Sequence, residues 1–409
     1  MIKKVLIISA AVLAILLICL GVGVQHLLDS WGLGWESSRR MAETINRRLD
    51  ADAAAVHDAE GPIRTPTGIA ERGFVRIGGI DQWVTIRGDD RRNPAILVLH
   101  GGPGDAYSQL AYLLRPWERD FTVVQWDQRG AGRTYGRYGQ ATPDMTLNRM
   151  IEDGAEVADY ARRRLGQKKI ILLGHSWGSA LGVQLLKRHP ELFSAYVGTG
   201  QIVDTAELDA DRYDYAMSRL LADHRSGAVA ELRRLGPPPY RTDAQDEAVR
   251  KWLNRYLAEP DKAYLYTSVV LMMRNPNDSF ADFQNLMKGH LSFSLPRMRR
   301  TYEAIDLRAL GEDMPVPFFL IDGRDDRLTP PHLAEAYFRK IRAPQKAMIL
   351  IGGGHFAFLS NASAFLDILV KRVRPEIMAR APESPVVRAR RASPAPPSPS
   401  GPPPLRRAG

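Results

Sequence analysis

One serine in the sequence has the neighbours expected of an activated nucleophile. Ser176 is the central residue of the stretch 174–178, which reads GHSWG, and it follows the apolar run 170–173. We expect a helix to begin near Ser179. A Gly-x-Ser-x-Gly string between a strand and a helix is typical of a sharp turn that lifts the serine hydroxyl above a sheet, and the glycines tolerate the crowding there. We therefore predict that Ser176 is a nucleophile.

His355 is the histidine best placed to serve as the base that such a serine needs. A serine hydroxyl is a weak nucleophile near neutral pH, so it requires a base within hydrogen-bond reach and an acid that orients the base. In this kind of site the chain order is serine, acid, histidine. Of the nine histidines, only His355 follows both an acidic loop and a last predicted strand. The glycines at 352–354 allow its loop to approach Ser176.

Three aspartates compete for the role of the acid. Asp322, Asp325 and Asp326 lie at or after the end of a late strand that is predicted at residues 316–321. We favour Asp326, because it lies three residues after a turn glycine and four before a proline, in a loop that can reach inward. Asp325 is the alternative, and Asp204, which follows an earlier strand, is a more distant one.

A glycine-rich loop precedes these residues in the chain. Residues 100–104, which read HGGPG, follow the apolar run 95–99, and their small side chains allow backbone N–H groups to point into a cavity. Attack by a serine turns a carbonyl oxygen into an oxyanion, and preorganised N–H donors lower that barrier by about 3 kcal/mol each. We predict that the N–H groups of Gly102 and Trp177 form this oxyanion hole. The alternative interpretation of the HGGPG loop is an ordinary turn.

A charged loop, residues 127–133, reads DQRGAGR and follows another apolar run. We expect its charges to brace the loops of the site. Direct contact with a substrate is the alternative.

Short apolar segments predict the strands that position these residues. Helix-length segments separate most of them, which is the pattern of parallel β-α-β units, so the predicted fold class is α/β. Residues 204–300 lack this rhythm and predict a helical insertion. A hairpin is expected at 74–77 and 82–87, further strands at 95–99, 121–126, 169–173, 195–198, 316–321 and 347–351, and a last helix at 362–373.

In combination, the HGGPG, DQRG and GxSWG motifs resemble those of the proline iminopeptidase branch of the α/β-hydrolases. The resemblance covers about residues 70–375. It implies the α/β-hydrolase fold, a mostly parallel eight-stranded sheet flanked by helices, with a helical cap inserted between late strands. It also implies that there is no metal or other cofactor, and that the reaction releases an N-terminal residue, often proline, from a small peptide.

The sequence departs from that family in ways that leave the substrate open. His175 stands where iminopeptidases typically have glycine. In the family, acids of the cap bind the free amino group of the substrate, but the acids of residues 204–300 match no motif, so the substrate-binding residues stay unassigned. An esterase, lipase or amidase with the same triad is the second hypothesis, and a non-catalytic binding module is the third. An epoxide hydrolase is disfavoured, because such relatives have aspartate in the place of Ser176.

The N-terminal region predicts a membrane anchor. Apart from Ser9, residues 5–24 carry no charged or strongly polar side chain, and about 20 such residues cross the hydrocarbon core of a bilayer as a helix. We expect an uncleaved single-pass anchor preceded by Lys3 and Lys4, with a cleaved signal peptide as the alternative. The catalytic region is expected outside the cytoplasm, in the periplasm or beyond the cell.

Charge and cysteine content exclude other classes of site. The formal net charge is +10, but residues 380–407 contribute six cations against one acid. A nucleic-acid-binding surface would instead cluster Lys and Arg on the folded part, so no nucleic acid is expected as a partner. The single cysteine, Cys19, lies in the N-terminal apolar run. The folded part can therefore form neither an internal disulfide nor a thiolate metal site.

These features divide the chain into successive parts. The proline-rich end cannot bury enough apolar surface to fold alone. The predicted parts are a membrane anchor or signal peptide at 1–27, a helical spacer at 28–68, a hydrolase core formed by 69–203 and 301–377, a helical cap at 204–300, and a disordered tail at 378–409.

Overall fold

The computed structural model describes residue 63, residues 65–240, 242–259, 261–262 and 264, and residues 278–380. The predicted membrane anchor lies outside these residues, as do most of the predicted spacer and tail. Within the part of the chain that is described, no helix is both long enough and apolar enough to cross a bilayer.

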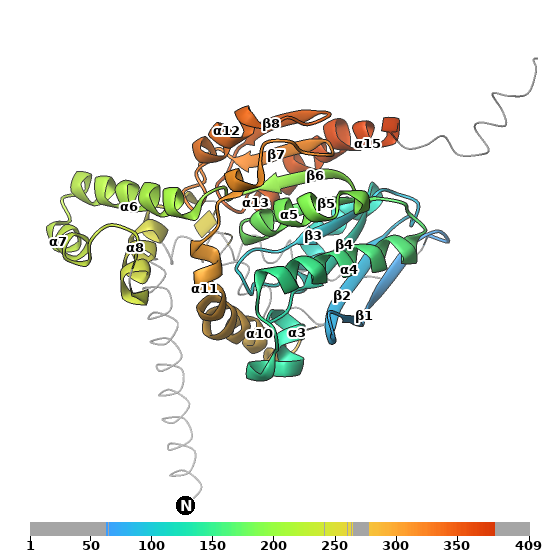
Figure 1. Ribbon diagram of the computed structural model, residues 1–409, viewed down its shortest axis with the longest axis horizontal. Coiled ribbons are helices and arrows are strands. Elements are labelled where there is room, and N and C mark those ends of the chain that lie inside the picture. Colours follow the sequence, from blue (N-terminus) through green and yellow to red (C-terminus); the bar gives the residue numbers. More distant parts are fainter. Residues whose placement is uncertain are drawn as a thin grey trace, which may run out of the picture.

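An eight-stranded sheet forms the centre of the molecule (Figure 1). Its strands follow the order β1-β2-β4-β3-β5-β6-β7-β8. The β1–β2 and β2–β4 pairs are antiparallel, and the other pairs are parallel, which confirms the predicted mostly parallel sheet. The strands are β1 Ile69–Ile77, β2 Ile80–Gly88, β3 Ala95–Leu99, β4 Thr122–Asp127, β5 Ile170–His175, β6 Phe193–Thr199, β7 Phe318–Gly323 and β8 Lys346–Ile351.

The strands predicted from apolar runs are all present, but some ends differ. β1 begins at Ile69 rather than at residue 74, because it pairs with β2 along its whole length, back to Gly88. Along most of β1, exposed and half-buried residues alternate, as expected for an edge strand with one face toward water. The charged residues Glu71 and Arg72 interrupt the apolar run by which the other strands were recognised.

Helices cover both faces of the sheet. One face packs against α4 (Leu147–Leu165), α5 (Trp177–Arg188) and α12 (Pro331–Lys340). The opposite face packs against η1 (Ser108–Arg119) and α14 (Ala362–Ile368). Figure 1 shows α4 and α5 crossing in front of the strands. Because both faces are covered, the central strands β3 and β5 are buried along their whole length, as their continuous apolar sequences require.

The last helix extends beyond its predicted end at residue 373. After α14 come the π-helix η6 (Leu369–Val373) and α15 (Arg374–Arg380). The tail predicted to begin at residue 378 therefore overlaps the end of α15. Pro375 lies at the second residue of α15 and does not stop the helix.

The predicted insertion is helical in its described residues. Its first helices, α6 (Thr205–Ala222), α7 (Ser226–Leu235) and α8 (Asp243–Arg255), share a small apolar core of their own, and Figure 1 shows them to the left of the sheet. The later helices α10 (Phe280–Met287) and α11 (Leu295–Glu303) flank the π-helix η4 (Lys288–Ser294).

The two ends of the insertion meet where they join the core. The N–H of Thr205 donates to the carbonyl oxygen of Ile305 (3.1 Å), and the N–H of Leu307 donates to that of Val203 (2.8 Å). At the first of these ends the Asp204 carboxylate accepts hydrogen bonds from the first turn of α6 and caps that helix.

Candidate active site

Ser176 lies at the sharp turn between β5 and α5. Its φ of +53° and ψ of −121° belong to a region that costs a residue with a side chain about 1–3 kcal/mol. The N–H of Ser176 donates to the carbonyl oxygen of Thr199 at the end of β6 (3.1 Å), and its carbonyl oxygen accepts from the N–H and the hydroxyl of Ser179 (2.8 and 2.6 Å). These bonds hold the turn, and α5 starts at Trp177, earlier than the predicted Ser179.

The glycines on either side of the serine have steric reasons to be there. A Cβ atom on Gly174 would lie 2.4 Å from the carbonyl oxygen of Gly178, and a Cβ atom on Gly178 would lie 2.2 Å from that of Leu99 in β3. Both distances are far shorter than van der Waals contact. The GxSxG pattern thus reflects the close packing of the start of α5 against β5 and β3.

His355 and Asp326 form a hydrogen-bonded pair. Nδ1 of His355 lies 2.9 Å from Oδ2 of Asp326, and both side chains are buried. The other carboxylate oxygen accepts from the N–H groups of Leu328 and Thr329 (each 2.8 Å), and the Thr329 hydroxyl donates to Oδ2 (2.7 Å). Burial would raise the pKa of Asp326, but His355 and these donors outweigh it and hold the pKa below its usual value. The carboxylate therefore stays ionised and fixes the imidazole.

The other aspartates considered for the acid do not contact His355 through their side chains. Asp325 is exposed to solvent. Asp322 is fully buried at the end of β7, where it accepts a hydrogen bond of 2.7 Å from the N–H of Gly200. Burial raises the pKa of Asp322 to about 7. Asp204 caps α6 and forms an ion pair with Arg308. The carboxylate of Asp204 therefore has a structural role at the start of the insertion.

Ser176 and His355 both lie beside the end of β6, at one corner of the sheet. The carbonyl oxygen of Thr199 holds the N–H of Ser176, and at the next residue a Cβ atom on Gly200 would lie 2.9 Å from Cε1 of His355. The ring centroids of His175 and His355 are 4.6 Å apart. The end of β6 thus borders both the serine turn and the imidazole.

The HGGPG loop lies beside the serine. A Cβ atom on Gly101 would lie 3.3 Å from Cβ of Ser176, and Gly102 has a φ of +112°, which favours glycine. Within the described parts of the chain, neither the N–H of Gly102 nor that of Trp177 donates a hydrogen bond to another residue. Both donors predicted for the oxyanion hole are therefore uncommitted.

Gln128 ties the HGGPG loop to the serine turn. Its N–H donates to Nε2 of His100 (3.1 Å), so the neutral ring of His100 carries its proton on Nδ1 and donates to the carbonyl oxygen of Gly101 (2.8 Å). Burial lowers the pKa of His100 to about 4, which keeps the ring neutral. The Gln128 side chain also accepts from Nε1 of Trp177 (3.1 Å). One residue of the DQRG loop thus connects all three motifs.

His175 connects the same loop to His355. Its Nε2 lies 3.0 Å from the carbonyl oxygen of His355, which can only accept, so Nε2 carries the proton. Nδ1 then accepts from the Tyr107 hydroxyl, which in turn accepts from the N–H of Gly101 (3.2 Å). Burial lowers the pKa of His175 well below its usual value, so the ring is neutral.

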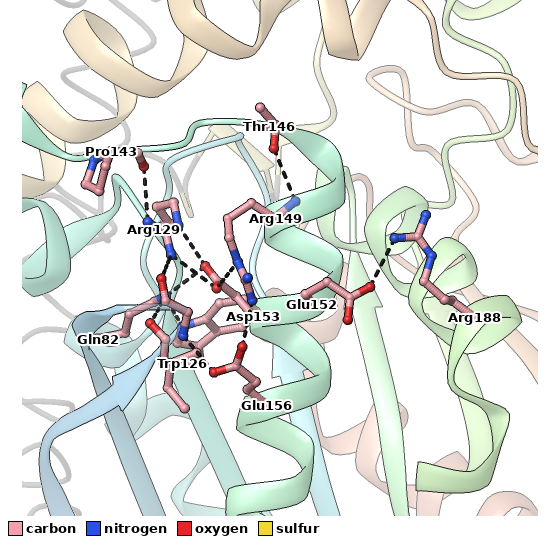
Figure 2. A network of polar contacts seen from close by, with 12 residues as sticks. Gln82, Trp126, Arg129, Pro143, Thr146, Arg149, Glu152, Asp153, Glu156 and Arg188 are labelled. Atoms are coloured by element: carbon pink, nitrogen blue, oxygen red, sulfur yellow. Dashed lines mark hydrogen bonds and ion pairs between the residues drawn. The ribbon is translucent and has the colours of Figure 1, made fainter.

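Arg129 braces the fold rather than facing the site. It forms an ion pair of 2.8 Å with Asp153 of α4, and both side chains are fully buried. Figure 2 shows this pair within a network in which Arg149 also contacts Asp153 and Glu156. The guanidinium of Arg129 further donates to the carbonyl oxygen of Gly78 in the β1–β2 turn (2.7 Å). The charge of Arg129 thus braces α4 and the β1–β2 turn, whereas the loop's charges were predicted to brace the loops of the site.

The chemistry offered by this arrangement is nucleophilic and acid–base. A strained serine, a buried imidazole–carboxylate pair and two uncommitted N–H donors gather at the carboxyl ends of parallel strands. Among the residues that the structure describes, no group of three or more His, Cys, Asp or Glu side chains is arranged to hold a metal ion.

Sequence comparison places this arrangement in a known family. A family model described as the alpha/beta hydrolase fold matches residues 94–362, which include both glycine-rich loops, the serine turn and His355. The chain belongs to the alpha/beta hydrolase family. Its members share the fold and carry diverse activities on it, so membership places this chain in a hydrolase family without naming its substrate.

Relatives of this hydrolase include named aminopeptidases. It is 28% identical to a probable aminopeptidase of Bacillus subtilis, an alignment that covers 73% of this chain and 94% of that protein. It is 31% identical over 182 residues to a probable proline iminopeptidase of Streptomyces coelicolor, covering 44% of this chain and 52% of that protein. An epoxide hydrolase of Xenopus tropicalis is 24% identical, covering 71% of this chain and 75% of that protein. Different hydrolases thus lie at similar distances.

Solved structures support the fold. The proline iminopeptidase-related protein of Thermus thermophilus superimposes with a TM-score of 0.54 at 21% identity, covering 76% of this hydrolase and 99% of that chain. At this identity the likeness concerns the fold.

One residue that contacts the site had no signal in the sequence. Asp261, from the cap insertion, is fully buried and accepts hydrogen bonds from the backbone N–H groups of His355 (2.6 Å) and Phe356 (3.1 Å). It is one of many acids in residues 204–300 and belongs to no motif. The contact depends on how the insertion folds back onto the core, which local sequence does not encode.

Proposed function

We propose that this hydrolase is a serine hydrolase, and that it acts as an aminopeptidase of the proline iminopeptidase type. Ser176 is the nucleophile, His355 the general base and Asp326 the residue that orients the base. The observation that carries the proposal is the buried hydrogen bond between His355 and Asp326, placed at the corner of the sheet that also holds the strained turn of Ser176.

Acylation follows from the protonation states at the site. Since Asp326 accepts from Nδ1–H of His355, Nε2 is free to take the proton of the Ser176 hydroxyl. The serine oxygen then bonds to the carbonyl carbon of the substrate. The carbonyl oxygen becomes negative and accepts from the N–H groups of Gly102 and Trp177. When this intermediate collapses, the carbon–nitrogen bond breaks, Nε2–H protonates the leaving amine, and an ester with Ser176 remains.

Deacylation repeats these steps with water. His355 removes a proton from a water molecule, whose oxygen attacks the ester carbon, and the same donors hold the second oxyanion. The bond to the Ser176 oxygen then breaks as Nε2–H returns a proton to it. The products are a free carboxylic acid and the original enzyme.

The nucleophile is tested with a fluorophosphonate probe, which labels activated serines. We expect the purified wild-type protein to be labelled and the Ser176→Ala variant to remain unlabelled while it keeps its melting temperature. Labelled Ser176→Ala would place the nucleophile elsewhere. Absence of labelling in well-folded wild-type protein would favour a non-catalytic binding module.

Substrate class is tested by comparing amides with esters. The relatives named as aminopeptidases support the aminopeptidase assignment, and one of them is matched over nearly its whole length. We expect a proline-aminoacyl chromogenic amide to be cleaved with a higher kcat/KM than short acyl esters, and N-acetylation of that amide to abolish cleavage. Preference for esters, with no effect of a blocked amine, would favour an esterase.

We also propose that residues 5–24 tether the enzyme to a membrane, with the catalytic region outside the cytoplasm. The apolar composition of that segment supports this placement. The full-length chain should remain in the membrane fraction after alkaline carbonate washing and should be digested by protease added to spheroplasts, from which any outer membrane and cell wall have been removed. Release by carbonate, or protection from the protease, would contradict the anchor or its orientation respectively.

A further inference from the structure

The backbone of His355 is held from both sides by side chains. Its N–H donates to Oδ2 of Asp261 (2.6 Å), and its carbonyl oxygen accepts from Nε2–H of His175 (3.0 Å). The two supports have different origins: His175 belongs to the serine turn of the core, whereas Asp261 belongs to the cap insertion. The position of the base therefore depends on a residue outside the core that carries the triad.

Asp261 is bound to this loop by both of its carboxylate oxygens. While Oδ2 accepts from the N–H of His355, Oδ1 accepts from that of Phe356 (3.1 Å). Consecutive N–H groups that converge on one carboxylate fix the local backbone, because rotation of either of the two peptide planes breaks one of these bonds. The side chain of Asp261 is fully buried, so no water competes for these donors.

The loop leaves space for this carboxylate at one residue. A Cβ atom on Gly354 would lie 1.9 Å from Oδ2 of Asp261. At Gly352, in the same loop, a Cβ atom would approach no atom closer than 3.8 Å. Gly354 is thus required by contact with the cap, and the two glycines provide a matched pair of sites for substitution.

The carboxylate also lies where charge develops during the reaction. Among the residues that the structure describes, no Lys or Arg forms an ion pair with Asp261, so its charge is balanced by the two backbone donors. His355 becomes positive when it takes the serine proton, and Asp261 interacts electrostatically with that ring. The pKa of Asp261 is raised above its usual value, because burial outweighs the lowering by the Phe356 and His355 groups.

We propose that Asp261 is a positioning residue through which the cap insertion sets the geometry of the His355 base. Catalysis then requires the cap to be docked on the His355 loop as well as folded. The inference rests on the proposed serine-hydrolase function.

The first test compares Asp261→Asn with Glu259→Gln in the full-length protein. A loss of alignment at the base should lower kcat by about 10- to 100-fold, with little change in KM, and should slow fluorophosphonate labelling of Ser176 by a similar factor. Glu259 is an exposed cap acid two residues earlier, paired with Lys262, and its variant should retain wild-type kcat. If Asp261→Asn keeps wild-type kcat and labelling rate, the inference is wrong.

The second test displaces the carboxylate without removing it. Gly354→Ala should lower kcat as Asp261→Asn does, whereas Gly352→Ala should not. Gly354→Ala and Asp261→Asn both disrupt the same contact, that of Asp261 with the His355 loop. The kcat of the double variant should therefore be no lower than that of the slower single variant. Multiplied losses would overturn the inference. If Asp261→Asn does not fold, the comparison of Gly354→Ala with Gly352→Ala is sufficient by itself, and equal kcat for those two variants would overturn the inference.

The outcomes separate this inference from the proposed function. If the wild-type protein is not labelled at Ser176, the serine-hydrolase assignment fails. If wild-type labelling is normal and the Asp261 and Gly354 variants match it, the assignment stands and only the role of Asp261 fails.

Discussion

The hydroxyl of Tyr107 donates a hydrogen bond of 2.5 Å to Nδ1 of His175. Because the same hydroxyl accepts from the N–H of Gly101, a continuous path of hydrogen bonds runs from the HGGPG loop to the carbonyl oxygen of His355. The histidine that departs from the iminopeptidase pattern thus links the predicted oxyanion loop to the predicted base.

Removing the Tyr107 hydroxyl should break this path. In Tyr107→Phe the buried N–H of Gly101 and Nδ1 of His175 both lose a partner, which should lower the free energy of unfolding by about 1–3 kcal/mol and reduce kcat more than it raises KM. The control is Tyr337→Phe, since the buried Tyr337 hydroxyl has no hydrogen-bond partner among the described residues. Urea denaturation should show little loss for the control. Equal behaviour of the two variants would contradict the path.

The two aspartates of the acidic loop should differ strongly when each is replaced by asparagine. Asp326→Asn removes the charge that orients His355 and should lower kcat by about 10³-fold or more. Asp325→Asn alters an exposed side chain and should leave kcat within about twofold. Steady-state kinetics on the same substrate measure both. Similar losses for the two variants would show that the acid is wrongly assigned.

The backbone strain at Ser176 should be measurable as stability. Glycine adopts a positive φ without the steric cost that any Cβ atom incurs. The free energy of unfolding of Ser176→Gly should therefore be about 1 kcal/mol higher than that of Ser176→Ala. Both variants lack the nucleophile, so the comparison is independent of activity. A Ser176→Gly variant less stable than Ser176→Ala would indicate that the turn is relaxed in solution.

Asp322 should make the protein less stable as the pH rises. Burial raises its pKa from 3.8 in the unfolded reference to about 7 in the folded protein. Between these values the folded state binds more protons than the unfolded state, so the free energy of unfolding falls with pH and levels off above about 7. Asp322→Asn, which stays neutral, should match the wild type near pH 4 and exceed it at pH 8, by about 1.4 kcal/mol per unit of pKa difference at most.

Urea denaturation at several pH values tests this expectation. A stability difference between Asp322→Asn and the wild type that does not change with pH would show that the carboxyl group does not titrate in this range.

The buried and exposed ion pairs of α4 in Figure 2 should differ in their contribution to stability. Arg129→Met leaves the buried Asp153 without its fully buried partner and should cost about 3–5 kcal/mol. Arg188→Met breaks the pair with Glu152, whose side chains are 42% and 40% exposed, and should cost at most about 1 kcal/mol. Chemical denaturation compares the two variants. Equal losses would mean that burial of the Arg129 pair adds nothing.

The central sheet could be predicted from the sequence because buried parallel strands are continuous apolar runs. The residues 95–99 show this most clearly, since the predicted and observed strand coincide. The edge strand β1 was recognised only in part, because the charged residues Glu71 and Arg72 interrupt its apolar run. Ser176 and His355 could be singled out because catalytic loops follow such strands at known places in the chain order.

What could not be predicted arises from contacts between distant segments. The three glycines before His355 were expected to allow approach to the serine, but Gly354 makes room for Asp261 of the cap. His175 was visible as a departure from a family pattern, while its partners Tyr107 and His355 emerged only in three dimensions. Local sequence does not predict which buried N–H group will donate a hydrogen bond to a carboxylate from a distant segment.

The insertion leaves and re-enters the core at adjacent points. Hydrogen bonds from Thr205 to Ile305 and from Leu307 to Val203 join these points, so the insertion is a replaceable unit. A different cap could be grafted between those residues without moving a strand. Such a chimaera would still inherit a His355 loop with two backbone donors facing inward. A successful donor segment would therefore have to supply its own acceptor at the place of Asp261, which limits how freely substrate preference can be exchanged among relatives.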